Sequence, residues 1–443
     1  MKKNLKKALL FALPVFLAMT LAACNKGGGS AGRTQTPREL VFWDMIRGPA
    51  DTYSAAAEKL TAQYNAENKD NIRVTISPLP WDNYYQVFLT AVTSGVAPDI
   101  STGAFMQSVQ YAEMGEGLPL DPVIDMWKKE NNPILREYSD AIFDLLMYEG
   151  KHYGLPVNLD TRQITYRTDY FNQAGISKLP ATWDEFEEAC AKLKAALPAD
   201  VYPIVFPGGG DYSGIHPTLS FLFQNGVGPT DAEGNPDFLN PKVTETLQFF
   251  HRLYVKGYVP EGLPAYVSSD AQRMYQSGKA AMFFQNVPQI TDFPEVNNNS
   301  AIMPPMAGPS GIAQYYTWVN AIQAYSQTED PDACYLFVKW WLENTLLLWT
   351  EGGMTTIPAR SSYWSDSVIA DNWARNQISK LVNSMTTPVY PSPTVYLPFS
   401  VIEGEGIPTI GMVKSMIRGE PDYAAIQKEV QEAMLTAWKQ FEN

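Results

Sequence analysis

GLPVNLDTRQITYRTDYF, residues 154–171, opens the middle third of this 443-residue chain and places polar side chains within a largely apolar extended run. Asn158, Asp160 and Arg162 occupy alternating positions in it. Because alternate side chains of a strand point to the same face, we expect these three to act together as hydrogen-bonding groups for a ligand. The alternative is an exposed strand face on which Asp160 forms a salt bridge.

The sequence before this stretch alternates predicted strands with predicted helices. Apolar periodicity and helix start and stop signals predict strands at 39–45, 72–79 and 97–102, and helices at 49–68, 81–95 and 105–115. This order predicts an α/β fold with a parallel sheet covered on both faces. In such sheets, ligands bind in the crevice beyond the carboxyl ends of the strands.

Candidate ligand contacts therefore lie where these strands end. Trp43, Asp44 and Arg47 come at the end of the first strand, and Phe105 and Gln107 follow the third. These side chains combine a flat apolar ring with carboxylate, guanidinium and amide groups, which suit the CH faces and hydroxyls of a sugar. For Trp43 the alternative is a core position under the sheet.

The sequence after residue 171 predicts a second α/β unit. A helix is expected at 183–196, the segment VYPIVFPGGG at 201–210 supplies a strand and a flexible loop, and further helices lie near Thr218 and Val243. Tyr212 follows the loop, where it either contacts a ligand or belongs to a solvated turn. The last third is mostly helical, with a Pro-rich irregular stretch at 387–398.

Longer stretches resemble a known family. Residues 151–193, KHYGLPVNLDTRQITYRTDYFNQAGISKLPATWDEFEEACAKL, resemble the crossover region of the family 1 extracellular solute-binding proteins of bacterial ABC importers, especially the sugar-binding members. SGVAPDI, YQSGKAAMFFQNVP, FVKWWLEN and GGMTTIPAR also follow the family's order. One departure is at 285–288, where Gln-Asn-Val-Pro replaces the usual Asn-Gly-Pro-Trp, which puts an aromatic contact there in doubt.

The resemblance implies a two-lobed fold of the type II periplasmic-binding-protein kind, with a ligand cleft between the lobes. It implies a first lobe from residues 38–157 and 318–355, and a second from 158–317 and 356–443. It also implies a stacking role for Trp318 and a lesser contact from Asn320. The expected protein is a monomer without a cofactor that binds a di- or oligosaccharide and delivers it to the permease subunits of an ABC transporter.

The N-terminus predicts export and a lipid anchor. Residues 1–23 have a basic start, an apolar stretch and small residues before a cut, as in a signal peptide. LAAC at 21–24 resembles the bacterial lipobox, in which Cys24 would be lipidated, and residues 24–37 would form a flexible tether. The protein would then be held on the outer face of the cytoplasmic membrane. The alternative is an uncleaved anchor helix.

Composition and motifs narrow the function further. A formal net charge of −14 argues against nucleic acid as a partner. The three histidines have no metal-ligand spacing, and the sequence contains no HExxH, CxxC or GxxxxGK[ST] motif, so neither an enzyme nor a metal site is expected. Cys190 and Cys334 are expected to be buried free thiols rather than a disulfide.

Two alternative functions remain open from the sequence. The same fold could bind a glycerophosphodiester or another polyol, and Arg47 with Arg162 could form the basic pocket that a phosphodiester needs. A glycoside hydrolase tethered to the cell surface would also be exported, acidic and rich in aromatic residues, and it would need two carboxyl groups about 5 to 10 Å apart in the cleft.

Overall fold

Parallel strands joined by helices build the first part of the fold, as the alternating pattern predicts. In the computed structural model, which describes residues 36–81, 83–381, 385–386 and 397–439, β1 pairs in parallel with both β2 and β3. The elements are β1 (Arg38–Met45), α1 (Ala50–Glu67), β2 (Ile72–Leu79), α2 (Tyr84–Thr93), β3 (Ile100–Ala104) and α3 (Phe105–Glu113). Each predicted strand and helix of this region is confirmed, although β3 starts three residues later than predicted.

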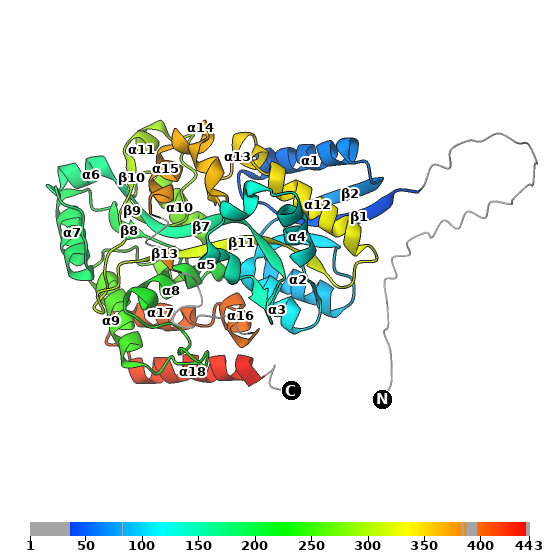
Figure 1. Ribbon diagram of the computed structural model, residues 1–443. Coiled ribbons are helices and arrows are strands. Elements are labelled where there is room, and N and C mark those ends of the chain that lie inside the picture. The colour runs from blue at the N-terminus through cyan, green and yellow to red at the C-terminus, as the bar shows by residue number, and fades with distance from the viewer. Residues whose placement is uncertain (1–35, 82, 382–384, 387–396, 440–443) are drawn as a thin grey trace, which may run out of the picture. The chain divides into compact units, whose positions relative to one another are not determined.

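Two long strands connect this part to the rest of the sheet (Figure 1). They are β7 (Gly154–Arg167) and β11 (Tyr315–Tyr325), and the sheet order is β2-β1-β3-β11-β7-β9-β8. β11 runs antiparallel to both β3 and β7, so the parallel pairing of the first strands does not extend to the return strand. The chain returns through β11 from the second part of the fold and therefore enters the first part against the direction of β3.

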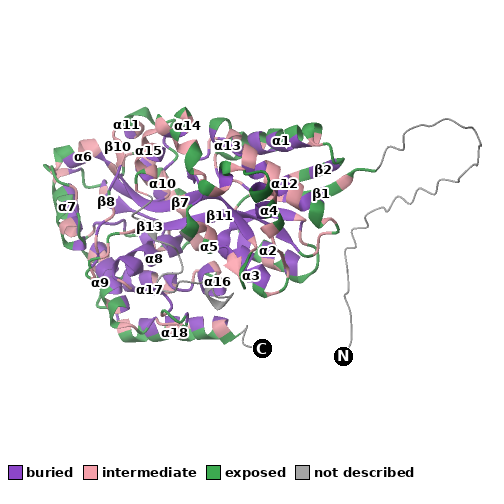
Figure 2. Cartoon of the chain, in the orientation of Figure 1, coloured by how far each residue is buried: buried purple, intermediate pink, exposed green. Residues whose placement is uncertain are grey.

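β7 changes its partner along its length. Its residues up to Arg162 pair with β11, whereas Gln163 to Tyr166 pair with β9 (Ala280–Gln285), which in turn pairs in parallel with β8 (Tyr202–Val205). Both β7 and β11 are buried over nearly their whole length (Figure 2). β7 therefore belongs to both parts of the sheet, and the change of partner falls between Arg162 and Gln163.

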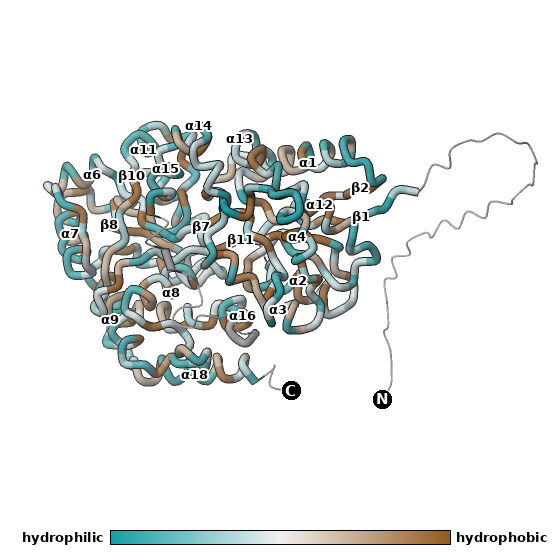
Figure 3. Tube along the Cα trace, in the orientation of Figure 1, coloured by the Kyte–Doolittle hydropathy of each residue, from teal (hydrophilic) through white to brown (hydrophobic). Residues whose placement is uncertain are grey.

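Two hydrophobic clusters form the core, and the first extends from β1 to the buried faces of α8 (Ile215–Gln224), α9 (Pro241–Val255) and α18 (Tyr423–Lys439). Phe42 of β1 lies in the first cluster with Trp341, and Phe283 of β9 lies in the second with Phe186. Phe186 belongs to α7 (Trp183–Ala196), which has the bounds that the sequence predicts and begins with the Thr182 hydroxyl accepting a hydrogen bond from the Glu185 amide at 3.2 Å. Outer helices such as α7 and α18 have hydrophilic residues along their length (Figure 3).

The C-terminal helices lie beside both parts. α16 (Leu397–Gly404) contacts α3 as well as α18, and α17 (Thr409–Ser415) contacts α18 and α9 (Pro241–Val255). Most of the irregular stretch predicted at 387–398 lies outside the described residues, as do the signal peptide, Cys24 and the start of the tether.

The fold also contains further helices and strands, of which α8 is buried at every residue. The helices are α4 (Asp121–Lys129), α5 (Asp140–Asp144), α6 (Thr168–Gln173), α8 (Ile215–Gln224), α10 (Ser268–Gln276), α11 (Pro294–Asn298), α12 (Pro331–Asn344), α13 (Leu347–Thr350), α14 (Ser367–Ala370) and α15 (Trp373–Ser379). The strands are β4 (Gly117–Leu118), β5 (Met147–Tyr148), β6 (Lys151–His152), β10 (Ser300–Ile302), β12 (Ile357–Pro358) and β13 (Met385–Thr386).

Two further sequence expectations bear on this fold. Cys190 and Cys334 are both buried and free, which confirms the prediction for them. In the part of the chain that the structure describes, no helix has both the length and the apolar character needed to cross a membrane.

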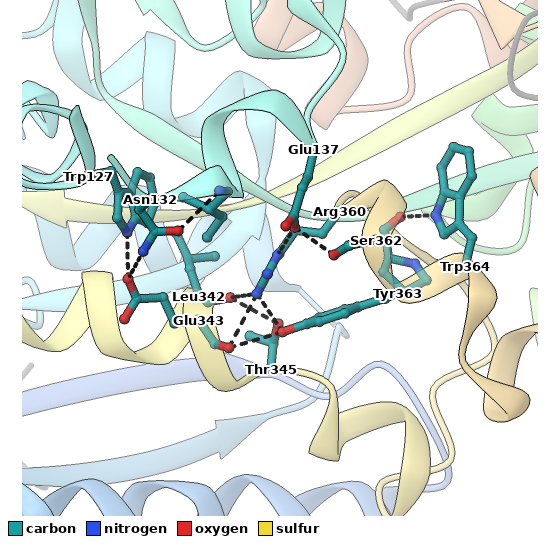
Figure 4. A network of polar contacts seen from close by, with 12 residues as sticks. Trp127, Asn132, Glu137, Leu342, Glu343, Thr345, Arg360, Ser362, Tyr363 and Trp364 are labelled. Atoms are coloured by element: carbon teal, nitrogen blue, oxygen red, sulfur yellow. Dashed lines mark hydrogen bonds and ion pairs between the residues drawn. The ribbon is translucent and has the colours of Figure 1, made fainter. Parts of the chain in front are cut away.

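A polar network ties the segment after β12 to the first part of the fold (Figure 4). The Arg360 Nε donates to Glu137 Oε2 at 2.6 Å, and its Nη1 donates to the Leu342 and Glu343 carbonyls at 3.0 and 3.2 Å. The Ser362 hydroxyl donates to the same Glu137 oxygen at 2.7 Å. These bonds fix the position at which the chain leaves β12.

Replacing Arg360 with alanine is expected to lower the free energy of unfolding by about 1 to 2 kcal/mol, because it removes charge-assisted hydrogen bonds from a carboxylate and two carbonyls that stay partly buried. Both partners of the ion pair keep 13% of their side-chain surface exposed, so the loss stays below that of a fully buried pair. Urea unfolding at pH 7 measures it. An Arg418→Ala variant, which breaks an exposed ion pair, is the control, and equal losses in the two variants would contradict the role of the network.

Candidate functional site

The register of β7 and β11 brings two groups of predicted residues together. Trp318 lies opposite Asp160, and Asn320 lies opposite Asn158. Directly opposed residues of an antiparallel pair share one face of the sheet. The alternating polar residues of β7 and Trp318 of β11 therefore lie on the same surface. The sequence places these residues far apart, and the pairing makes them neighbours.

This surface is the floor of a cavity of about 680 Å³, which is within the range of about 300 to 1,000 Å³ usual for small-molecule sites. β7, β9 and β11 contribute lining residues, as do the start of α2, the loop and 3-10 turn before α8, and the end of α16. The lining residues are Trp81, Asn83, Tyr84, Tyr85, Gln86, Ala104, Asp160, Arg162, Gly210, Asp211, Tyr212, Ser213, His216, Ser268, Gln285, Asn286, Trp318, Asn320 and Gly404.

Five of the predicted contact residues line the cavity. They are Asp160, Arg162, Tyr212, Trp318 and Asn320. Tyr212 belongs to a 3-10 turn, Tyr212–Gly214, which follows the predicted flexible loop. Asn158 shares their face of β7 but is 0% exposed and lies outside the lining, at a position of β7 that pairs with both β11 and β12.

The predicted residues at the ends of β1 and β3 lie outside the lining. Asp44 and Arg47 turn inward and pair with each other, with Arg47 Nη2 to Asp44 Oδ1 at 2.6 Å. The Tyr53 hydroxyl donates to the other carboxylate oxygen at 2.9 Å, and the Thr102 hydroxyl donates to Oδ1 at 2.6 Å. The hydrogen-bonding capacity of Asp44 is therefore used within the fold.

The three remaining predicted residues pack behind or beside the cavity. Trp43 meets the Phe88 ring of α2 edge to face at 5.4 Å. Phe105 lies against Trp318, with the ring centroids 5.7 Å apart, and so supports a lining residue from behind. The Gln107 amide donates to the Tyr111 hydroxyl at 3.2 Å.

A row of aromatic rings follows one side of the cavity. Trp81 and Tyr84 lie 5.0 Å apart, and Tyr84 meets Tyr212 at 5.9 Å. Tyr212 meets the His216 ring at 5.5 Å, and His216 meets Trp318 at 6.2 Å. The row therefore crosses from α2, beside the first part of the sheet, to the turn before α8 and back to β11.

The charged groups of the floor balance each other. Arg162 Nη1 lies 2.5 Å from Asp160 Oδ1, and its Nη2 lies 3.4 Å from His216 Nε2. Because a guanidinium can only donate, His216 accepts through Nε2 and is neutral. Burial lowers the pKa of His216 well below its usual value, and the positive charge of Arg162 lowers it further. Protonation of His216 would place two cations side by side.

A buried carboxyl stands beside the aromatic row. The Tyr212 hydroxyl donates to Glu403 Oε1, and Glu403 is 1% exposed. Burial raises the pKa of Glu403 well above its usual value, and the charge of Arg162 opposes this shift. Among the residues that the structure describes, no group of three or more His, Cys, Asp or Glu side chains could hold a metal ion.

Several lining residues were not expected from the sequence. The segment WDNYYQ at 81–86 follows the carboxyl end of β2, so the rule applied to β1 and β3 would also have found its aromatic rings. His216 was considered only as a metal ligand. Gln285 and Asn286 stand where the family usually has Asn-Gly, and no local signal points to Glu403 or Gly404.

Comparisons with known proteins identify the family and the fold of the chain. Residues 48–345 match the family described as bacterial extracellular solute-binding protein. A putative binding protein of Brucella abortus (strain 2308) is 24% identical over 311 residues, which are 67% of this chain and 72% of that protein. The arabinooligosaccharide-binding protein of Halalkalibacterium halodurans is 24% identical over 237 residues, or 51% of this chain and 48% of that protein.

A similar solved structure is that of a sugar transporter from Arthrobacter chlorophenolicus A6 with bound laminaribiose. It has a TM-score of 0.80 and 22% identity, and the alignment covers 90% of this chain and 99% of that one. The maltose-bound MalE3 of T. maritima has a TM-score of 0.75 at 17% identity, with 90% and 99% of the two chains covered. The fold is therefore the two-lobed fold of sugar-binding proteins. With the family match, these findings show that the chain belongs to the bacterial extracellular solute-binding proteins.

Proposed function

We propose that this protein captures a neutral di- or oligosaccharide in the cavity above β7 and β11 and delivers it to the permease subunits of an ABC transporter. The observation that carries the proposal is the lining of this cavity, which joins a row of aromatic rings to hydrogen-bonding groups that include the Arg162–Asp160 ion pair and the carboxylate of Asp211. The family is one of binding proteins rather than enzymes.

The aromatic rings suit the apolar faces of sugar rings. Trp318 lies on the floor and Trp81, Tyr84 and Tyr212 lie along one side. Aromatic side chains present a large flat area at low conformational cost, and those with a polar tip also hydrogen-bond. The Trp318 Nε1–H has no hydrogen-bond partner among the described residues, which supports a role as donor to a ligand hydroxyl after a small adjustment of the ring.

The charges favour a neutral ligand. Among the described lining residues Arg162 is the cation, and Asp160 pairs with it. His216 is neutral because of burial, so the floor carries no net positive charge. A glycerophosphodiester would need a cluster of cations, and Arg47, the second cation expected to help, is paired with Asp44 outside the lining. The floor therefore favours hydroxyl-bearing ligands over phosphate-bearing ones.

Similar proteins support the same ligand class. The relative from Halalkalibacterium halodurans is named for arabinooligosaccharides, and the structure from Arthrobacter chlorophenolicus A6 contains laminaribiose. We extend this class to the present chain because its cavity has the aromatic and polar groups that such ligands need. A surface-tethered hydrolase is not supported, since the matched family consists of binding proteins.

The proposal includes how binding is coupled to delivery. The two lobes, 38–157 with 318–355 and 158–317 with 356–443, would close around the sugar, because contacts from both lobes exist only in the closed form. A lipid on Cys24 would hold the monomer at the outer face of the cytoplasmic membrane, and residues 24–37 would let it reach the permease.

A ligand screen tests the proposed function. A soluble form beginning at Asn25 is heated with neutral oligosaccharides, polyols, glycerophosphodiesters and short peptides, and the unfolding temperature is recorded. A ligand at one hundred times its Kd stabilises the fold by about 2.7 kcal/mol, so a clear rise is expected with at least one neutral oligosaccharide, which should be recovered intact.

The outcomes of the screen separate the alternatives. A shift with polyols or phosphodiesters alone would replace the proposed ligand class, and recovery of a shortened sugar would show hydrolysis. A variant with Arg162 and Asp160 both replaced by alanine is the control, and it should lose the sugar-dependent shift because these side chains lie on the cavity floor.

A further inference from the structure

A helix beyond the family match forms part of the cavity wall. The matched region ends at residue 345, whereas α16 spans Leu397–Gly404 and supplies the lining residue Gly404. Its Glu403 accepts the hydrogen bond of Tyr212, another lining residue. The C-terminal segment therefore holds the aromatic row in place at a point that the family match does not cover.

α16 also packs closely against α2, which supplies other lining residues of the cavity. A side-chain Cβ at Gly404 would lie 2.9 Å from the Tyr85 ring, so the backbone of α16 touches α2 at this position. The neighbouring Tyr84 of α2 meets Tyr212 edge to face at 5.9 Å. Glu403 is thus enclosed by side chains of α2 and of the turn before α8, and separation of these elements would open it to water.

We propose that Glu403 is a positioning residue of the binding cavity, whose protonated carboxyl holds Tyr212 against Tyr84 and so keeps the aromatic wall closed around the ligand. Tyr212 donates to Oε1, and the added proton removes the cost of an ionised carboxylate at a site that is 1% exposed. The predicted effect of Glu403 on sugar binding rests on the proposed function. The protonation of Glu403 does not depend on it.

The surroundings of Glu403 contain one cation that is already paired. The titratable or charged groups near Glu403, near its partner Tyr212 or near the tyrosines of α2 beside them are Arg162 and Asp160 of β7, Asp211 before Tyr212, His216 of α8, Tyr84 and Tyr85 of α2, Tyr111 of α3, Tyr316 of β11 and the exposed Glu405. Burial raises the pKa of Tyr84, Tyr85 and Tyr111 and keeps them neutral, and Arg162 pairs with Asp160. The buried face of α18, which packs on α16, carries no charged side chain.

The direction of the pH effect follows from the raised pKa of Glu403. The pKa of Glu403 is higher in the folded protein than its value of 4.5 in the unfolded chain. The resulting contribution to the free energy of unfolding is fully present below pH 4.5, and it is lost as pH rises through the pKa of the folded protein. His216 acts in the opposite direction, because its folded pKa lies below 6.5 and its contribution is lost as pH falls. Glu403 therefore lowers the free energy of unfolding as pH rises, whereas His216 lowers it as pH falls.

The first arm of the test needs no ligand. Urea unfolding of the purified chain, of Glu403→Gln and of Glu405→Gln is measured from pH 5 to pH 8; Glu405 is the exposed neighbour on the same segment. The unfolding constant of the wild type should rise relative to that of Glu403→Gln by up to about tenfold per pH unit within the titration window. Glu405→Gln should follow the wild type, and parallel profiles for wild type and Glu403→Gln would overturn the proposal.

The second arm measures the affinity for laminaribiose by calorimetry at the same pH values. The wild-type affinity should fall as pH rises. Glu403→Gln should bind without this fall, because its amide oxygen still accepts from Tyr212. Glu403→Leu has no acceptor for Tyr212 and should bind at least about fivefold more weakly than Glu403→Gln at every pH. Equal affinities of Glu403→Leu and Glu405→Leu would overturn the positioning role. If the wild type does not bind laminaribiose, the choice of sugar in the proposed function fails, and the first arm alone decides whether Glu403 holds the proton.

Discussion

Replacing Asp44 with alanine is expected to lower the free energy of unfolding by about 3 to 5 kcal/mol, because it leaves the guanidinium of Arg47 buried without its anion. The two side chains are 0% and 2% exposed and lie 2.6 Å apart. The same substitution takes away the acceptor of the Tyr53 and Thr102 hydroxyls. Chemical denaturation at pH 7 measures the loss.

An exposed ion pair supplies the matched control for Asp44. Lys59 and Glu351 lie 2.7 Å apart, with 59% and 48% of their side-chain surfaces exposed. Glu351→Ala should cost at most about 1 kcal/mol, because water and salt screen exposed pairs. An Asp44→Ala loss as small as that of Glu351→Ala would show that Arg47 reaches water, and the inward-facing arrangement at the end of β1 would then be incorrect.

Replacing Trp318 with alanine is expected to weaken oligosaccharide binding by at least about 2 kcal/mol, which is about thirtyfold in Kd. Trp318 lies on the cavity floor, and Phe105 and Tyr316 support its ring at 5.7 and 5.6 Å. A ring held in this way presents its area to the ligand at little entropic cost. Calorimetry well below the unfolding temperature separates the loss of affinity from any loss of stability.

Two variants control the Trp318 experiment. Trp318→Phe retains a ring and should recover part of the affinity. Trp340→Ala removes a partly buried tryptophan that packs on Tyr64 at 5.3 Å outside the cavity lining, so its Kd should equal that of the wild type. If Trp318→Ala binds as tightly as Trp340→Ala, Trp318 does not contact the ligand.

Local patterns in the sequence are sufficient to predict much of the fold. The strand at 72–79 and the helix at 183–196 have the predicted bounds, because alternation and capping signals depend on residues close together in the chain. The direction of β11 depends instead on how the chain returns from the second part. The predicted parallel pairing holds for the first strands, and the antiparallel direction of the return strand has no local signal in the sequence.

The candidate site was predicted where it depends on strand periodicity. Asp160 and Arg162 line the cavity because alternate residues of β7 share a face, and Trp318 joins them through the register with β11. The rule for strand ends places Asp44 and Arg47 at the correct edge of the sheet, but it does not tell whether two opposite charges face a ligand or each other. Glu403 meets Tyr212 only through the folded course of the last helices.

The crystal structure of the protein with the neutral oligosaccharide that gives the largest thermal shift would test the central claim most directly. We predict that the sugar lies in the cavity above β7 and β11, with one ring on Trp318 and hydroxyls bonded to Asp160 and Arg162. A sugar bound elsewhere on the protein, or a cavity that stays empty when the sugar saturates the protein in solution, would contradict the account.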